Sequence, residues 1–129
     1  MKLFAIDPDA TFDLVIEAQK DDPKEDQVIF KIKVLTLKEM LKVEKIFKDL
    51  AAAQDEGTEA SLEQVEVFLS KGLELVLKGW ENLQFKSGKL CPFEGYENRL
   101  LEVLSMAVAS QILTGAVELN SLQSEDKGN

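Results

Sequence analysis

The chain contains no histidine and only one cysteine, and these two gaps exclude much of enzyme chemistry. Without histidine there is no common general base, no usual zinc ligand set and no Ser-His or Cys-His nucleophile pair. Cys91 cannot form an internal disulfide, and beside Pro92 with no base available it is interpreted as a small packed side chain. A single unpaired cysteine is typical of a reducing compartment, so we expect a cytoplasmic protein.

Glycine-rich loops and long apolar runs are also lacking. The seven glycines are scattered and form no phosphate-binding loop, and the acidic stretches around Pro8 and Pro23 lack calcium-loop spacing. The longest apolar region, residues 100–119, is interrupted by polar and charged side chains, so we expect no membrane partner. The sequence therefore predicts a protein that is not an enzyme, with no catalytic residues, no cofactor and no metal ion.

Positive charge is scarce as well. The chain has 15 Lys and Arg against 24 Asp and Glu, a net charge of −9, and we expect no nucleic-acid partner because phosphate binding needs clustered cations. The exception is residues 31–48, where six lysines and two glutamates leave a local surplus of four positive charges. Two interpretations stay open for this segment: a solvated helix face, or a basic strip that pairs head to tail with a second copy.

The first third of the chain has the alternation of half-buried strands. Every second side chain is apolar in residues 11–18 and again in residues 28–34: Phe12, Leu14, Ile16 and Ala18, then Val28, Phe30, Ile32 and Val34. We expect an antiparallel hairpin with a long, charged and mobile connection over residues 19–26. Residues 1–6 are a candidate for a third short strand.

The remainder has helical periodicity. Thr36 and Glu39 form a capping-box pattern, from which we expect a helix to about residue 53. After a polar break at residues 54–59, a second capping-box pattern at Ser61 and Gln64 predicts another helix. Gly79 lies where a left-handed cap would end that second helix.

A third predicted helix, from Glu97 to about Leu119, is apolar on nearly every side. Two helices and a hairpin offer little cover for such a helix, so we expect self-association or partner binding through it. In the alternative interpretation, Gly115 ends or kinks the helix and each half packs on a different side. Residues 121–129 are polar and charged and are predicted to form a flexible tail.

Residues 80–96 form a predicted irregular arm that is rich in aromatic side chains, with a turn at residues 87–89. Trp and Tyr are favoured anchors at protein interfaces, although Trp80 could instead close the core with Phe93 on its other side. The arm and the last helix supply the candidate partner-binding residues Trp80, Leu83, Phe85, Phe93, Tyr96, Leu101, Val108 and Ile112.

Two segments give the chain a resemblance to a known family: Phe30-Lys31-Ile32-Lys33-Val34-Leu35-Thr36-Leu37-Lys38-Glu39, and Gly79-Trp80-Glu81-Asn82 with the following Ser87-Gly88-Lys89 and Pro92-Phe93. In these segments it resembles the tail assembly chaperones of long-tailed bacteriophages. In that family an extended segment enters a helix at Leu-Thr, and a later helix ends in Gly-Trp-Glu-Asn before a short turn and a Pro-Phe. The resemblance covers roughly residues 28–129.

The resemblance implies a non-enzymatic role in the host cytoplasm. Several copies would coat the tape measure protein, keep it soluble and help to recruit subunits of the major tail (tube) protein, and the chaperone would be absent from the mature virion. Two other classes stay open: a small dimeric structural or adaptor protein of a phage particle, and a carrier of a small apolar ligand, which needs an enclosed pocket.

Together these patterns predict an α+β fold in one domain over residues 1–120, followed by the tail. Its body is expected to be mainly α-helical, with three long helices and an N-terminal antiparallel β-hairpin or small sheet.

Overall fold

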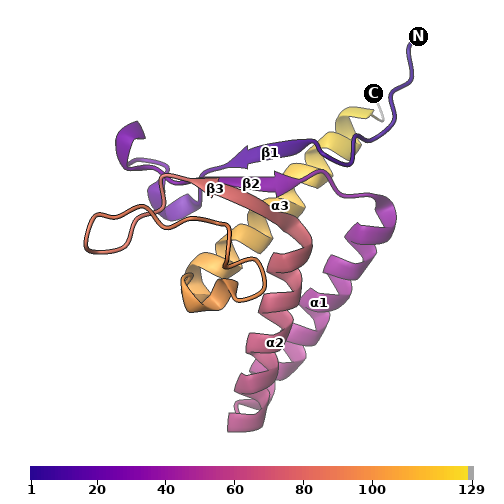
Figure 1. The fold of residues 1–129 in the computed structure, drawn as a ribbon. Coiled ribbons are helices and arrows are strands. Elements are labelled where there is room, and N and C mark those ends of the chain that lie inside the picture. The colour runs from indigo at the N-terminus through magenta and orange to yellow at the C-terminus, as the bar shows by residue number, and fades with distance from the viewer. Residues whose placement is uncertain (128–129) are drawn as a thin grey trace.

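The computed structural model describes residues 1–127, with side chains for residues 1–59 and 61–121. The fold is α+β, as predicted: a three-stranded antiparallel sheet of order β1-β2-β3 joins a body of three helices (Figure 1). The elements are β1 (Thr11–Leu14), β2 (Ile29–Lys33), α1 (Leu37–Glu56), α2 (Glu59–Val76), β3 (Leu77–Glu81) and α3 (Met106–Lys127). Short 3₁₀ turns occupy Glu17–Gln19 (η1), Lys24–Asp26 (η2) and Leu100–Glu102 (η3).

The predicted hairpin of β1 and β2 is confirmed, but β1 is shorter than expected. It ends at Leu14, and the chain then turns so that Ile16 is buried while Ala18 lies exposed in η1. The prediction of one strand face through residue 18 is therefore wrong. Residues 1–6 form no strand, and their side chains are exposed.

The charged connection between β1 and β2 is held by two glutamine side chains. The Val28 backbone N–H donates to Gln19 Oε1 at 2.9 Å, and Gln27 Nε2 donates to the carbonyls of Gln19 and Asp22, both at 3.1 Å. Side-chain amides thus satisfy backbone groups that the two 3₁₀ turns leave unpaired. The loop that we expected to be mobile is tied at both of its ends.

The capping box at the start of α1 is confirmed: the Glu39 backbone N–H donates to Thr36 Oγ1, and Glu39 Oε1 accepts from the Thr36 N–H at 3.0 Å. The predicted start of α2 is wrong. Gly57, with φ 64°, ends α1 in the left-handed conformation, and Thr58 then caps α2 by accepting from the Ser61 N–H at 3.0 Å. The break is therefore only two residues long, and Ser61 is buried in the first turn.

The sequence analysis missed strand β3. Helix α2 ends at Val76 and passes directly into β3, so Gly79 lies in a strand and is not a helix cap. In the β2–β3 register Phe30 faces Trp80 and Lys31 faces Gly79. Five residues that include a glycine and two charges carry too little strand signal beside a long helical stripe.

Helix α3 differs from the prediction at both ends. It begins at Met106, after η3, and continues through Gly115 to Lys127, so Gly115 does not end it. The backbone of the predicted tail is helical over residues 121–127, and residues 128–129 lie outside the described residues. A Cβ on Gly115 would come within 2.8 Å of the Leu14 side chain, which shows how closely β1 approaches α3 here.

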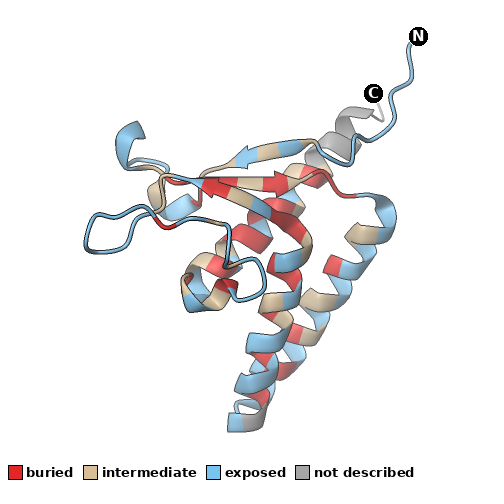
Figure 2. Ribbon diagram, viewed as in Figure 1, coloured by how far each residue is buried: buried red, intermediate tan, exposed pale blue. Residues whose placement is uncertain are grey.

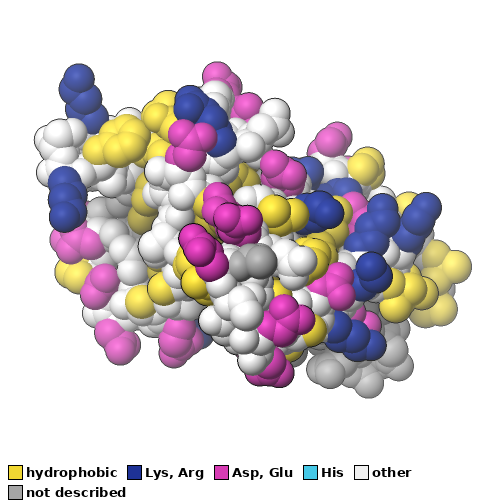
Figure 3. Space-filling model, turned by 90° about the horizontal axis from the view of Figure 1, so that it is seen from below, with side chains coloured by type: hydrophobic (Ala, Val, Ile, Leu, Met, Phe, Trp, Pro, Cys, Tyr) yellow, Lys and Arg dark blue, Asp and Glu magenta, His cyan; other side chains and the backbone are white. Residues whose placement is uncertain are grey.

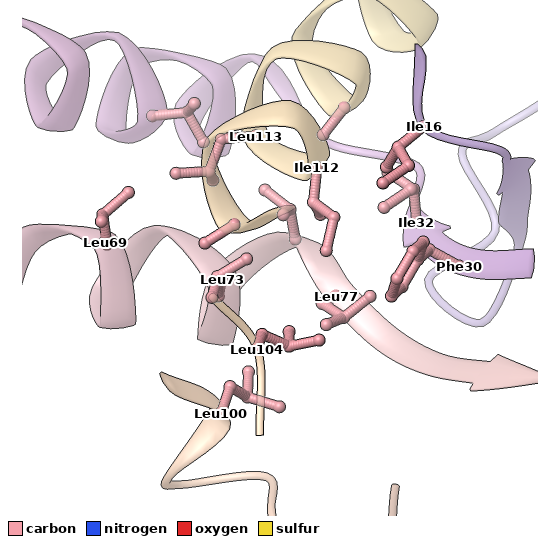
Figure 4. Packing of buried hydrophobic residues seen from close by; sticks show 14 of the residues in the cluster. Ile16, Phe30, Ile32, Leu69, Leu73, Leu77, Leu100, Leu104, Ile112 and Leu113 are labelled. Carbon is pink, nitrogen blue, oxygen red and sulfur yellow. The ribbon is translucent and has the colours of Figure 1, made fainter. Parts of the chain in front are cut away.

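The core lies between the sheet, α2 and α3, as the red bands of Figure 2 show. Ile112 and Leu113 are fully buried, and Figure 4 shows Ile112 among Ile32, Phe30 and Leu77. The exposed side of α3 carries Ala107, Ser110, Thr114 and Glu118. Over residues 108–120 the apolar side of α3 is thus covered by other parts of the chain, and the apolar residues 100–104 that completed its predicted stripe belong to η3 and the following turn.

Candidate protein-binding groove

The structure places two of the predicted partner-binding residues inside the core. Trp80 Nε1 donates to the Cys91 carbonyl at 2.7 Å, and the indole ring meets Phe93 and Phe30 edge-on, with centroid distances of 4.9 and 6.5 Å. This arrangement satisfies the polar end of the indole and anchors the arm to the sheet. Ile112 is fully buried in α3. Neither side chain is available on the surface of the described fold.

The other predicted residues do not form one surface. Leu83, Phe93, Tyr96 and Val108 are half-buried against the core, and the Tyr96 ring also lies 4.6 Å from the Arg99 guanidinium. Phe85 is exposed on a small hairpin closed by the predicted turn at Gly88, whose φ is 91°. Only Leu101 lies at a substantial apolar hollow.

That hollow, which we call the acid-rimmed groove, lies between the first turns of α2 and the segment joining η3 to α3. It has a volume of about 550 Å³, within the usual range for binding clefts of about 300–1,000 Å³. Its lining residues are Glu59, Leu62, Glu63, Glu66, Leu101, Leu104, Ser105 and Met106.

The floor of the groove is fixed by the core. Leu100 and Leu104 are buried, and Figure 4 shows both beside Leu73 of α2. The Leu104 N–H donates to the Leu100 carbonyl at 2.9 Å, which closes the turn that follows η3. Since α3 begins only at Met106, this turn leaves a corner against α2 that no helix fills.

The sides of the groove combine exposed apolar side chains with negative charge. Leu62 is 59% exposed and Met106 is 49% exposed. Glu59, Glu63 and Glu66 follow helical spacing of four and three residues, so their carboxylates lie along one side of α2. Glu59 also stabilises the first turn of α2 through the helix dipole. An apolar floor with an acidic rim fits an apolar helix stripe that is flanked by lysine or arginine.

Cys91, the single cysteine of the chain, is buried. Burial raises the pKa of the Cys91 thiol, which makes the reactive thiolate scarcer. Among the described residues, no three His, Cys, Asp or Glu side chains are grouped so as to hold a metal ion. Nor does any described helix combine the length and apolarity needed to cross a membrane.

Three further hollows of about 290–380 Å³ lie elsewhere on the described residues. One is between η1 and α3, one lies beside Asn82, and one runs between α1 and α2 with lysines at its edge. All three, like the acid-rimmed groove, open to solvent. They give no support to a carrier that encloses a small apolar ligand.

The sequence analysis found Leu101 but missed the residues opposite it. The available signal was the apolar stripe of α2, which runs through Leu62, Leu69 and Leu73; Leu69 and Leu73 are buried, whereas Leu62 at the start of the stripe is exposed. Its partner Met106 could not be placed while residues 97–119 were taken as one helix. Comparisons with protein families, with characterised proteins and with solved structures gave no match for this chain.

Proposed function

We propose that the protein is a non-enzymatic binding protein that holds amphipathic helices of an elongated client, in the manner of a phage tail assembly chaperone. The observation that carries this proposal is the acid-rimmed groove, in which Leu62, Leu101 and Met106 present apolar surface beside three glutamates. The resemblance of two sequence segments to tail assembly chaperones supports the tape measure protein as the proposed client. The second proposed partner is the major tail (tube) protein, whose subunits the chaperone would help to recruit to the client.

The physical requirements of that role match the groove. A long helical client exposes apolar stripes that aggregate unless another surface covers them. The apolar floor of the groove can cover such a stripe. The net charge of −9 on this chain favours solubility of the complex. The acidic rim selects helices whose stripe is bordered by basic residues.

The test is co-expression of the tape measure protein with three forms of this chain: the native sequence, the groove variant Leu62→Gln/Met106→Gln, and Leu90→Gln. Leu90 is a matched control because it is 65% exposed but lies on the 84–90 hairpin, outside the groove. We expect the native chain and Leu90→Gln to keep the client soluble and to co-purify with it, and the groove variant to lose both properties.

A second measurement uses a defined probe, a synthetic amphipathic helix with leucines at positions i and i+4. One version is flanked by lysines and the other by glutamates. Fluorescence anisotropy should show tighter binding of the lysine version, weakened by added salt. The proposal fails if the client neither co-purifies nor gains solubility, and equal binding of both peptides would contradict the role of the rim.

A further inference from the structure

Helix α1 presents a basic ridge at its beginning, which we define as Leu37, Lys38, Leu41 and Lys45. Leu37 and Leu41 are 77% and 57% exposed and are four residues apart, so their side chains are neighbours on the helix surface. Lys38 and Lys45 are exposed on the same side of the helix, and Lys45 Nζ also lies 3.8 Å from Asp49 Oδ2 in an exposed ion pair that a carboxylate of a partner can replace. Figure 3 shows several dark-blue side chains close together at the right of this view, with some magenta ones among them; other dark-blue side chains lie at its upper left.

The ridge has the features that the acid-rimmed groove requires. It is a convex helix edge with two apolar anchors and flanking lysines, and the groove is a hollow with an apolar floor and three glutamates. We propose that the groove of one copy binds the α1 ridge of a second copy. This inference rests on the proposed function, since it takes the groove as a helix-binding surface and names one occupant.

The positions of the two surfaces make this contact head to tail. Helices α1 and α2 are joined by two residues and pack side by side in opposite directions (Figure 1). The ridge lies at the start of α1 and the groove at the start of α2, about 15–20 Å apart along the helix pair at 1.5 Å per residue. One chain therefore cannot place its own ridge in its own groove. A contact between different surfaces of identical chains leaves a free ridge at one end and a free groove at the other.

The contact also has a consequence for client binding. Because a client helix and the α1 ridge would use the same groove, they compete for it. In the absence of client, a second copy covers the exposed apolar surface at Leu62 and Met106. A client helix that binds more tightly displaces the ridge. The α1 ridge of a second copy thus occupies the groove when no client is bound.

The test uses two variants that each remove one half of the contact. The ridge variant is Leu37→Gln/Leu41→Gln and the groove variant is Leu62→Gln/Met106→Gln; glutamine resembles leucine in helix propensity. In sedimentation velocity, we expect the native chain and Leu90→Gln to form concentration-dependent species larger than a dimer. Each variant alone should associate about tenfold or more weakly, and an equimolar mixture should form a 1:1 dimer and nothing larger. Circular dichroism checks that every variant is folded.

A charge-reversal pair provides an independent measurement if a groove variant is misfolded. Glu63→Lys/Glu66→Lys should abolish self-association of the chain, and adding Lys38→Glu/Lys45→Glu to the same chain should restore it. The inference is overturned if the native chain stays monomeric, if the ridge variant associates like the native chain, or if the mixed variants stay monomeric. The ridge variant should still hold the tape measure protein. If the mixed variants dimerise but no form holds the client, the proposed function fails and the self-contact stands.

Discussion

The sheet end of the molecule and the far end of the α1–α2 pair differ in how their polar and apolar side chains are placed. At the sheet end, polar groups are paired inside the core: Trp80 donates to Cys91, and Asn120 joins α3 to the end of β2. At the far end the two helices project beyond the sheet and α3 (Figure 2). There Leu62 is 59% exposed and lines the acid-rimmed groove together with three glutamates.

This difference separates the residues that hold the fold from those that are free to bind. A buried hydrogen-bonded group stabilises one arrangement of the chain, and its loss leaves an unpaired partner in the core. An exposed leucine contributes little to folding, and it is the grouping of Leu62 with Leu101 and Met106 in one hollow, not its exposure alone, that indicates a binding surface. Substitutions at the sheet end should therefore lower stability, whereas substitutions at the far end should lower association.

The largest loss of stability is expected for Trp80→Ala. The substitution removes the edge-on contacts to Phe30 and Phe93 and leaves the Cys91 carbonyl without its donor, so the free energy of unfolding should fall by about 3–5 kcal/mol. Urea denaturation measures the change. Phe85→Ala, at an exposed aromatic of the same arm, is the control and should cost much less. Equal losses would show that the arm is not anchored through the indole.

Asn120→Ala should give the next largest loss. The Leu35 N–H donates to Asn120 Oδ1 at 2.7 Å, and Asn120 Nδ2 donates to the carbonyls of Ala116 and Lys33 at 2.9 and 3.2 Å. Without the amide these buried groups lose partners, at a cost of about 1–3 kcal/mol. Thermal unfolding should show a lower midpoint for Asn120→Ala, while the exposed Asn98→Ala should leave it unchanged. An unchanged midpoint for both would remove the proposed link between α3 and β2.

Glu39→Gln should have a smaller and pH-dependent effect. Burial acts to raise the pKa of Glu39, but hydrogen bonds from Lys33 and from Thr36, with the positive charge of Lys33, outweigh it and hold the pKa below its ordinary value of 4.5. A carboxyl whose pKa is lower in the folded state stabilises the protein above its unfolded pKa, and this stabilisation is lost as pH falls through the folded pKa.

The native chain should therefore exceed Glu39→Gln by about 1–2 kcal/mol near neutral pH, and the gap should shrink below pH 4.5. Urea unfolding across a pH series measures it, with the exposed Glu44→Gln as the control. A gap that is constant from neutral pH to pH 3 would contradict the assigned role of the carboxylate.

The smallest effect on stability is expected at the far end. Leu62→Gln should change the free energy of unfolding by no more than about 0.5 kcal/mol, because its side chain is mostly in water already. Leu69→Gln, two turns further along the same apolar stripe of α2 and buried, should destabilise by several times as much. If Leu62→Gln is as damaging as Leu69→Gln, the groove is part of the core and not a binding surface.

The sequence predicted the fold class, the β1–β2 hairpin and the capping box of α1 because each rests on local chemistry. A period of two, a Thr-x-x-Glu pattern and a glycine turn at residue 88 can be read within a few residues. The prediction of where α2 starts was wrong because Thr58 and Ser61 are both suitable N-cap residues. The left-handed conformation of Gly57, which ends α1, decides in favour of Thr58.

Most residues of the candidate site could not be predicted from local sequence patterns. Residues 100–119 have a continuous helical stripe, and nothing nearby marks the interruption after η3 that brings Leu101 and Met106 opposite Leu62. The burial of Ile112 depends in the same way on tertiary packing, since the sheet and α2 cover α3 from both sides. A groove between distant segments needs their arrangement in space.

The single indole ring gives the chain a built-in optical reporter. Because Trp80 packs between Phe30 and Phe93, its emission follows the opening of the arm from the sheet, and far-ultraviolet ellipticity is dominated by the helices. Coincident transitions for the two signals would mark a single cooperative unit. A shift of ellipticity ahead of fluorescence would identify fraying of the projecting helix pair while the rest stays intact.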